Sequence, residues 1–331
     1  HAEAYAHIKR GRLVAVSSRQ PGKLNAFADR FGVAGRFTDY REMFAQAKPD
    51  LVHVNTPPNV RLEIFQAAAE AGVPALIVEK PLAIQGEDYL AIADFASDAR
   101  IKIAINHQLH FHPRRQVLQK LVAEGAIGPV RFIDASARMN MAYQGTHTLQ
   151  AIAAFNPDAT PTSVFGQAAG VEGLRDTPRK HFAPDESLSA LTFDNGVSAL
   201  LRCGTNAPYV LAGDERVNVH KRITVYGERG HVAWTMWSWQ TLIDGHVEGG
   251  AHDYAAEDVL GQAAMTEAMF DWLEDDRAVH PLHLQAALQD FDIVLKTYMS
   301  ALHHRVEQPG SPPEPDLINK LRTALKQMER G

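Results

Sequence analysis

The sequence is poor in cysteine. Cys203 is the only one among 331 residues, so no disulfide can form within the chain. Disulfides are typical of oxidising compartments, and their exclusion favours a reducing, cytoplasmic location. No activating partner stands near Cys203 in the sequence, so we expect it to be a core residue and not a nucleophile.

Long apolar runs and long basic runs are missing as well. No apolar run approaches the roughly 20 residues that a bilayer-spanning helix needs. No cluster of Lys and Arg is typical of nucleic-acid binding either. We therefore expect neither a membrane nor a nucleic acid among the partners.

The amino terminus lacks an initiator methionine and a glycine-rich phosphate loop. The chain opens at His1, in a stretch that reads as a helix over residues 1–8. A phosphate loop is expected immediately before such a helix in a dinucleotide-binding fold. A true loss of this loop would also remove a central strand and leave sheet edges unpaired. We therefore expect the first strand and the loop to lie upstream of His1.

The rest of the composition is that of an ordinary globular protein, with 45% hydrophobic residues, 22% charged residues and a net charge of −6. The length is sufficient for about two domains. Residues 1–125 alternate strand-like and helix-like segments, which predicts βαβ units and a doubly wound parallel α/β sheet. In residues 126–331 strands follow one another, with the hairpin signal Asp194-Asn-Gly196, before helices return. This pattern predicts a second, largely antiparallel α+β domain.

Three tryptophans, Trp234, Trp237 and Trp239, fall in the second domain. We expect one strand over residues 232–239 and another over 241–243, so that Trp237 and Trp239 share a face. A core or a subunit interface is favoured over sugar stacking. A large sheet with aromatic residues on its outer face needs a partner, which predicts a homodimer or homotetramer formed through this sheet. Helices are expected over 261–273, 283–303 and 317–329.

The segment Ala75–Pro81, Ala-Leu-Ile-Val-Glu-Lys-Pro, is the focus of the first domain. A buried parallel strand ends there in a carboxylate, an amine and a proline. Ligands bind outside the carboxyl ends of such strands, which places Lys80 where a cofactor and a substrate would meet. A surface pair of Glu79 and Lys80 beside a turn is the alternative. Asn55, Thr56 and Pro57 close the preceding strand at the same edge and can line a cofactor cleft.

Ser18 and Arg19 follow the strand-like residues 13–16. In a dinucleotide fold, an acid at the end of the second strand binds the ribose 2′-hydroxyl, whereas an arginine there accommodates a 2′-phosphate. Ser18 and Arg19 can both donate to a phosphate, which favours NADP, with NAD as the alternative. A solvent-exposed loop without a ligand would also fit these residues.

Several motifs then occur in order: the His1 helix, Thr56-Pro57, Glu79-Lys80-Pro81, Asn106 with Phe111-His-Pro113, and Gly145-Thr-His147. Together they resemble the glucose–fructose oxidoreductase / inositol dehydrogenase (Gfo/Idh/MocA) family, and Glu-Lys-Pro is the most telling of them. The resemblance implies a Rossmann domain, an open-faced sheet domain and NAD(P)-linked oxidation or reduction of sugars and polyols. It also implies that Glu79 and Asn106 lie in the cofactor site, that Lys80 contacts the substrate and the nicotinamide ribose, and that His147 transfers a proton.

The chemistry of these residue types agrees with the resemblance. Removing a hydride from a carbinol carbon requires a base for the hydroxyl proton, and histidine titrates in the useful range. The Lys80 ammonium can stabilise a developing alkoxide. A structural role is the alternative for His147. No metal ligand is predicted, because the spacing of the other histidines does not indicate a metal site; they include His107, His110, His112, His303 and His304.

The sequence departs from the family's pattern at four positions. Tyr143 and Gln150 stand where many members have aspartates, Arg61 replaces a histidine, and His110 replaces an arginine. Tyr143 is predicted to serve as a hydroxyl donor or second acid, and Gln150 as a substrate contact.

We therefore predict an NAD(P)-dependent oxidoreductase acting on a carbohydrate-like hydroxyl or carbonyl group. Two alternatives stay open: a redox-assisted lyase, isomerase or glycosidase that retains its cofactor, and a non-catalytic nucleotide-binding regulatory protein.

Overall fold

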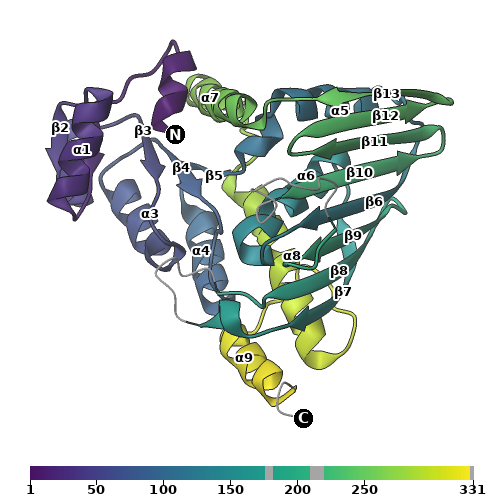
Figure 1. Cartoon of the computed structure of the whole chain (residues 1–331). Coiled ribbons are helices and arrows are strands. Elements are labelled where there is room, and N and C mark those ends of the chain that lie inside the picture. Colours follow the sequence, from purple (N-terminus) through teal and green to yellow (C-terminus); the bar gives the residue numbers. More distant parts are fainter. Residues whose placement is uncertain (176–181, 209–219, 329–331) are drawn as a thin grey trace.

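The computed structural model describes residues 1–175, 182–208 and 220–328. It contains a parallel α/β half and a large, mostly antiparallel sheet backed by helices (Figure 1). This is the predicted fold class. Among the described residues, no helix is both long enough and apolar enough to cross a membrane.

The amino-terminal half is built from short parallel strands and the helices that connect them. Strands β1 and β2 form one sheet, and β3, β4 and β5 form another in that order. The strands are β1 (Ala15–Ser17), β2 (Gly35–Phe37), β3 (Leu51–Val54), β4 (Ala75–Glu79) and β5 (Lys102–Asn106). The helices are η1 (Ala2–His7), α1 (Pro21–Phe31), α2 (Tyr40–Ala47), η2 (Pro58–Val60), α3 (Arg61–Glu70) and α4 (Gly86–Asp98).

Strand β4 shows why this region forms a parallel sheet. All four residues from Ala75 to Val78 are fully buried. Leu76 and Val78 belong to the main core, whereas Ala75 and Ile77 face a second cluster that contains Met265 of α7 (Tyr254–Glu274). A strand covered on both faces needs a continuous apolar sequence, which is what residues 75–78 supply.

Helix α7 follows the sheet domain in sequence but packs against β4 and η1 of the first half. The division at residue 125 therefore stays a prediction. The helix begins seven residues before the predicted start at Gly261, because the Asp253 side chain caps it by accepting from two backbone N–H groups. Gly261 lies inside the helix, where a Cβ would come within 2.9 Å of the Gln108 carbonyl oxygen. Here glycine allows close packing and does not interrupt the helix.

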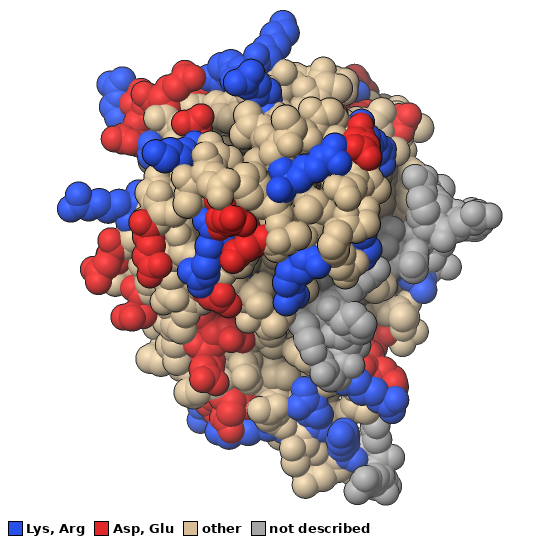
Figure 2. All heavy atoms as spheres, turned by 90° about the vertical axis from the view of Figure 1, so that its left-hand side faces the viewer, with Lys and Arg blue, Asp and Glu red and all other residues tan. Residues whose placement is uncertain are grey.

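Acidic and basic side chains lie side by side over the face that carries α1 and α3 (Figure 2). Arg41, for example, pairs with Glu63 at 3.1 Å. Neighbouring charges of opposite sign leave this face without a field that would favour one kind of charged partner.

The second half is an eight-stranded sheet in the order β13-β12-β11-β10-β6-β9-β8-β7. All neighbours are antiparallel except β6 and β9. The strands are β6 (Val130–Ala137), β7 (Pro161–Ala169), β8 (Glu186–Phe193), β9 (Ser198–Cys203), β10 (Lys221–Gly227), β11 (Gly230–Thr235), β12 (Ser238–Ile243) and β13 (His246–Ala251). The predicted hairpin at Asp194-Asn-Gly196 joins β8 to β9, with Gly196 at φ 83°.

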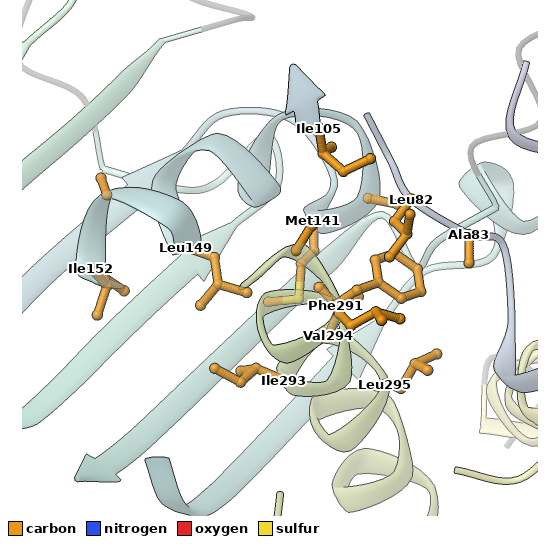
Figure 3. Close-up of a cluster of buried hydrophobic side chains, with 14 of the residues drawn as sticks. Leu82, Ala83, Ile105, Met141, Leu149, Ile152, Phe291, Ile293, Val294 and Leu295 are labelled. Atoms are coloured by element: carbon orange, nitrogen blue, oxygen red, sulfur yellow. The ribbon is translucent and has the colours of Figure 1, made fainter. Parts of the chain in front are cut away.

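Helices cover one face of this sheet. They are α5 (Pro113–Ala123), α6 (Thr146–Phe155) and α8 (Leu284–His303), while α9 (Leu317–Met328) packs on α8. Leu149 of α6 and Phe291 of α8 lie in one apolar cluster with Leu82 and Ile105 of the first half (Figure 3). Helix α8 therefore joins the core of the sheet domain to that of the parallel half.

The prediction of one strand over residues 232–239 is wrong, because β11 and β12 form a hairpin there. The Thr235 hydroxyl accepts from the backbone N–H groups of Trp237 and Ser238 and stabilises the reversal. Trp237 therefore lies in the bend and not beside Trp239 in one strand. The segment contains no glycine, proline or asparagine at the bend, so the turn was missed.

Trp234 and Trp239 belong to the helix-covered side of the sheet. Trp234 is 2% exposed and lies opposite Trp239 across the two strands. The Arg114 guanidinium of α5 stands 4.3 Å from the centre of the Trp239 ring. The expectation of an outer aromatic face is therefore wrong for these residues, and the core interpretation is confirmed for Trp234.

Candidate active site at the carboxyl ends of the parallel strands

The carboxyl ends of β3, β4 and β5 lie side by side, as predicted from their sequences. Glu79, at the end of β4, is paired in register with Asn106, at the end of β5. The Asn106 amide donates to Glu79 Oε1 at 2.7 Å. Asn55 follows β3 at the same edge and is exposed. This edge therefore brings Asn55, Glu79 and Asn106 together, whereas Ser18 and Arg19 follow β1 in the other sheet.

Glu79 also lies at one end of a hydrogen-bonded series of aromatic side chains. His1 donates from Nε2 to Glu79 Oε1 at 2.9 Å, and its Nδ1 lies 2.8 Å from His53 Nδ1. His53 Nε2 is 3.0 Å from the Tyr5 hydroxyl. Burial lowers the pKa of His53 to about 3. No local pattern pointed to His53, because an isolated histidine in a short strand has no special spacing.

Thr56 and Arg61 fix the turn after β3. The Arg61 guanidinium is 1% exposed and donates to the Thr56 carbonyl oxygen at 3.1 Å. Burial lowers the pKa of Arg61 to about 10, while Glu79 opposes the shift. The Thr56 hydroxyl is buried without a hydrogen-bond partner among the described residues. The turn thus presents a polar atom that a ligand can satisfy. Pro57 precedes η2 and is exposed.

Ser18 follows β1, and its hydroxyl accepts from the Gln20 N–H at 3.2 Å. Arg19 is exposed. Both therefore lie in the loop after the strand, as predicted, and the guanidinium of Arg19 is accessible.

Lys80 joins the two halves of the protein. Its ammonium donates to the Tyr143 carbonyl oxygen at 2.6 Å and lies 4.2 Å from the centre of the Tyr143 ring. Tyr143 belongs to the single π-turn Met141–Gly145, labelled η4, which leads into α6. The structure therefore brings Lys80 and Tyr143 together through the carbonyl and the ring face.

His147, in the first turn of α6, is 5% exposed. Its ring meets that of His107 edge-on, with centres 5.1 Å apart. Burial lowers the pKa of His147 well below its usual value, and His107, Lys80, Lys221 and Arg115 lower it further. The imidazole is therefore neutral in the free protein. Its Nδ1 has no hydrogen-bond partner within the described part of the chain.

Gln150 lies one turn further along α6 and contacts His110. The Gln150 amide donates to His110 Nδ1 at 2.9 Å. Burial lowers the pKa of His110 to about 3, so this is a neutral pair. Gln150 and His110, two of the four positions singled out in the sequence, are thus direct neighbours.

A pocket beside His147 carries charged residues that the sequence did not single out. Its polar lining includes Arg115, Thr148 and Lys221, and Trp234 forms an apolar wall. Arg115 is 1% exposed, and its Nε and one terminal nitrogen have no hydrogen-bond partner among the described residues. Burial and the nearby Lys80 lower the pKa of Lys221 to about 7. Only tertiary packing brings these residues to His147, so no local pattern could have revealed them.

Comparisons with known proteins agree with this architecture. The profile described as "Oxidoreductase family, NAD-binding Rossmann fold" (GFO_IDH_MocA) matches residues 1–119. An inositol 2-dehydrogenase from Rhizobium meliloti (strain 1021) is 26% identical over 253 residues, which span 70% of this chain and 71% of that protein.

Solved structures show the same fold over nearly the whole chain. A levoglucosan dehydrogenase in complex with NADH and levoglucosan is 17% identical, with a TM-score of 0.78 over 94% of this chain and 96% of that one. An oxidoreductase from Agrobacterium radiobacter, solved with NAD+, L-tartaric acid and magnesium, is 18% identical. Its TM-score is 0.76, over 93% of this chain and 94% of that one.

The predicted resemblance is confirmed by the profile match to the amino-terminal half, the curated relative and the fold of both halves together. Residues 1–119 match the NAD-binding Rossmann domain of the Gfo/Idh/MocA oxidoreductase family, and the whole chain has the two-domain fold of solved oxidoreductases.

Proposed function

We propose that this protein transfers a hydride between NAD(P) and a carbohydrate-like hydroxyl or carbonyl group, with Lys80 and His147 as its catalytic residues. The observation that carries the proposal is the contact between the two domains: Lys80, at the rim of the parallel sheet, donates to the Tyr143 carbonyl oxygen at 2.6 Å, in the turn that leads directly into the helix carrying His147. Dehydrogenation of an alcohol needs this combination of a cation and a base.

The residues at the strand ends fit a dinucleotide. The residues that would hold it are Asn55, Thr56, Pro57, Glu79 and Asn106. The Thr56 hydroxyl and the Asn106 side-chain oxygen Oδ1, both without a hydrogen-bond partner among the described residues, supply polar contacts. NAD(P), when bound, provides the acceptor for the hydride. Lys80 stabilises the alkoxide charge on the substrate oxygen, and the neutral His147 accepts the hydroxyl proton. Tyr143, stacked against Lys80, and Gln150 orient the substrate.

The pocket beside His147 is only water-sized, so we propose the substrate class from the charged side chains around it. Arg115, Lys221 and Thr148 there can donate to an anion, and a carboxylate would satisfy the orphaned guanidinium nitrogens of Arg115. A bound anion would also raise the pKa of His147 from its depressed value toward the range of a useful base. We therefore propose a sugar acid or a related hydroxy acid as the preferred substrate, and a neutral sugar or polyol as the alternative.

The cofactor preference rests on Ser18 and Arg19. An exposed arginine after β1, with Ser18 and Gln20 and no acid as its sequence neighbours, favours NADP over NAD. We further propose that the protein works in the cytoplasm, because Cys203 is its only cysteine and no disulfide can form within the chain.

We also propose a homodimer or homotetramer formed through the sheet. The face opposite the helices carries Phe165 and Tyr226, which are 41% and 38% exposed. Burying them against a second copy would remove apolar surface from water. Sedimentation should show a dimer or a tetramer, and a monomer at micromolar concentration would refute this proposal.

The test of the main proposal is a dehydrogenase screen of sugars, polyols, their lactones and sugar acids with both cofactors, followed by Lys80→Met and His147→Asn on the best substrate. Each substitution should lower kcat by about 10²–10³-fold while the far-UV spectrum persists, and His147→Asn should also retain cofactor binding. Unchanged turnover in both variants would refute their assigned roles.

The screen also separates the alternatives. Reduced cofactor accumulating in proportion to product supports the dehydrogenase. Product without net cofactor change indicates the redox-assisted lyase, isomerase or glycosidase. Cofactor binding with no turnover of any substrate indicates the regulatory protein.

A further inference from the structure

Three ligand-type side chains from distant parts of the sequence meet beside the pocket. His112 precedes α5, His252 precedes α7, and Glu257 lies in the first turn of α7. Glu257 Oε2 is 3.4 Å from His112 Nδ1 and 3.8 Å from His252 Nδ1. One potential ligand atom from each residue lies within 4.8 Å of the other two.

All three atoms are buried and have no hydrogen-bond partner among the described residues. The His112 side chain is fully buried and the His252 side chain is 2% exposed. Both ring nitrogens of His112 are unpartnered in the described part of the chain. Buried polar atoms without a partner are rare in native proteins, and a cluster of them around one point indicates a missing ligand.

The orientation of His252 adds an independent observation. Its Nε2 donates to the Thr235 carbonyl oxygen at 2.9 Å, because a carbonyl can only accept. In the neutral imidazole the lone pair is therefore on Nδ1, which faces Glu257. Metal-bound histidines are typically fixed in this way, with the second ring nitrogen bonded to a carbonyl or carboxylate.

His112 also faces the second histidine directly. The two imidazole rings meet edge-on, with centres 4.9 Å apart. Arg114 and Arg115, which follow His112 in α5, disfavour another cation here, and the Glu257 carboxylate offsets this.

We propose that His112, His252 and Glu257 bind one Zn²⁺ ion. Two histidines and one carboxylate form a known zinc ligand set, with a fourth position left for water or another small ligand. Zinc bonds of 2.0–2.1 Å place neighbouring tetrahedral ligand atoms about 3.4 Å apart, close to the two distances to Glu257. The sequence did not indicate this site, since 140 residues separate the two histidines.

The ion would join α7 to the segment before α5. That segment includes η3 (Gln108–Phe111), whose His110 contacts Gln150 at the active site. Gln108 also donates to Asp258 of α7 at 3.0 Å. The metal would thus hold η3 in position against α7, next to the proposed proton-transfer residue, without itself contacting the substrate.

The test begins with protein stripped by a chelator and then titrated with ZnCl₂. Wild-type protein should retain one zinc per chain after gel filtration. At a zinc concentration one hundred times the Kd, its Tm should rise by about 4 °C. Glu257→Gln keeps the size of the side chain and should lose both effects, as should His252→Gln. His246→Gln, at an exposed histidine in β13, is the matched control and should behave as wild type.

Cobalt provides a spectroscopic readout that does not depend on activity. One equivalent of Co²⁺ should give the visible absorption of a four-coordinate site in wild type and in His246→Gln, but not in Glu257→Gln. The proposal is overturned if stripped wild-type protein, after titration with ZnCl₂ and gel filtration, holds no zinc. It is equally overturned if Glu257→Gln binds zinc as wild type does, because the ion would then occupy another site.

Discussion

Replacing Lys221 by methionine should stabilise the protein at neutral pH. It should also make the free energy of unfolding depend less on pH. Lys221 is 4% exposed, and burial together with Lys80 lowers its pKa from 10.5 to about 7. Between these two values the unfolded chain holds a proton on Lys221 that the folded protein does not. Stability therefore rises with pH across this window and falls as the pH decreases toward 7.

The magnitude follows from the size of the shift. Each pH unit corresponds to about 1.4 kcal/mol for one proton, so the cost at pH 7 reaches at most about 5 kcal/mol. Methionine has a similar length and carries no charge, so Lys221→Met should remove this cost. We therefore compare the slopes of Tm against pH. For a chain of this size, the wild-type slope should exceed that of the variant by about 2 °C per pH unit.

The assay is thermal unfolding of both proteins from pH 7 to pH 10. Lys102→Met is the matched control, because the Lys102 ammonium is held at the surface by Asp276 at 2.6 Å. This control should keep the wild-type slope. Parallel curves for wild type and Lys221→Met would refute the assignment of a neutral, buried amine. The same variant should bind a sugar acid more weakly, since a site with an unfavourable charge commonly trades stability for function.

Three further changes have defined outcomes. Gln150→Asp places a carboxylate one helical turn from His147 and should move the acidic limb of the kcat/KM profile up by about one pH unit; superimposable profiles would contradict this. Arg19→Ala should lower kcat/KM for NADP about tenfold relative to NAD, and an unchanged ratio would argue against the phosphate contact. Gly166→Ala would place a Cβ 2.2 Å from the Thr297 carbonyl oxygen, so the free energy of unfolding should fall by about 1–3 kcal/mol in chemical denaturation; wild-type stability would show that α8 can move.

Local residue patterns were sufficient to predict the parallel sheet of the first half and the position of Lys80 at the edge of that sheet. The run from Ala75 to Val78 is apolar throughout, and a strand that is buried on both faces must be so. The residue after such a strand lies at the ligand-binding edge whatever the rest of the chain does. The same local logic located Asn55, directly after β3, and Asn106, the last residue of β5, because these two strands flank β4.

Local patterns failed to predict two boundaries, because a side-chain hydrogen bond made the turn or the helix start there in place of glycine, proline or asparagine. The hydroxyl of Thr235 makes the reversal between β11 and β12, and the carboxylate of Asp253 starts α7. Threonine and aspartate occur in many other settings, so the residue type alone did not predict the turn or the helix start.

Tertiary structure alone decided what surrounds His147. Lys80, Arg115 and Lys221 come from three separate elements, and their joint effect on the imidazole depends on burial and distance. The cluster of His112, His252 and Glu257 arises in the same way. The strength of an electrostatic interaction depends on spatial separation and on the exclusion of water, and neither is encoded in the spacing of residues along the chain.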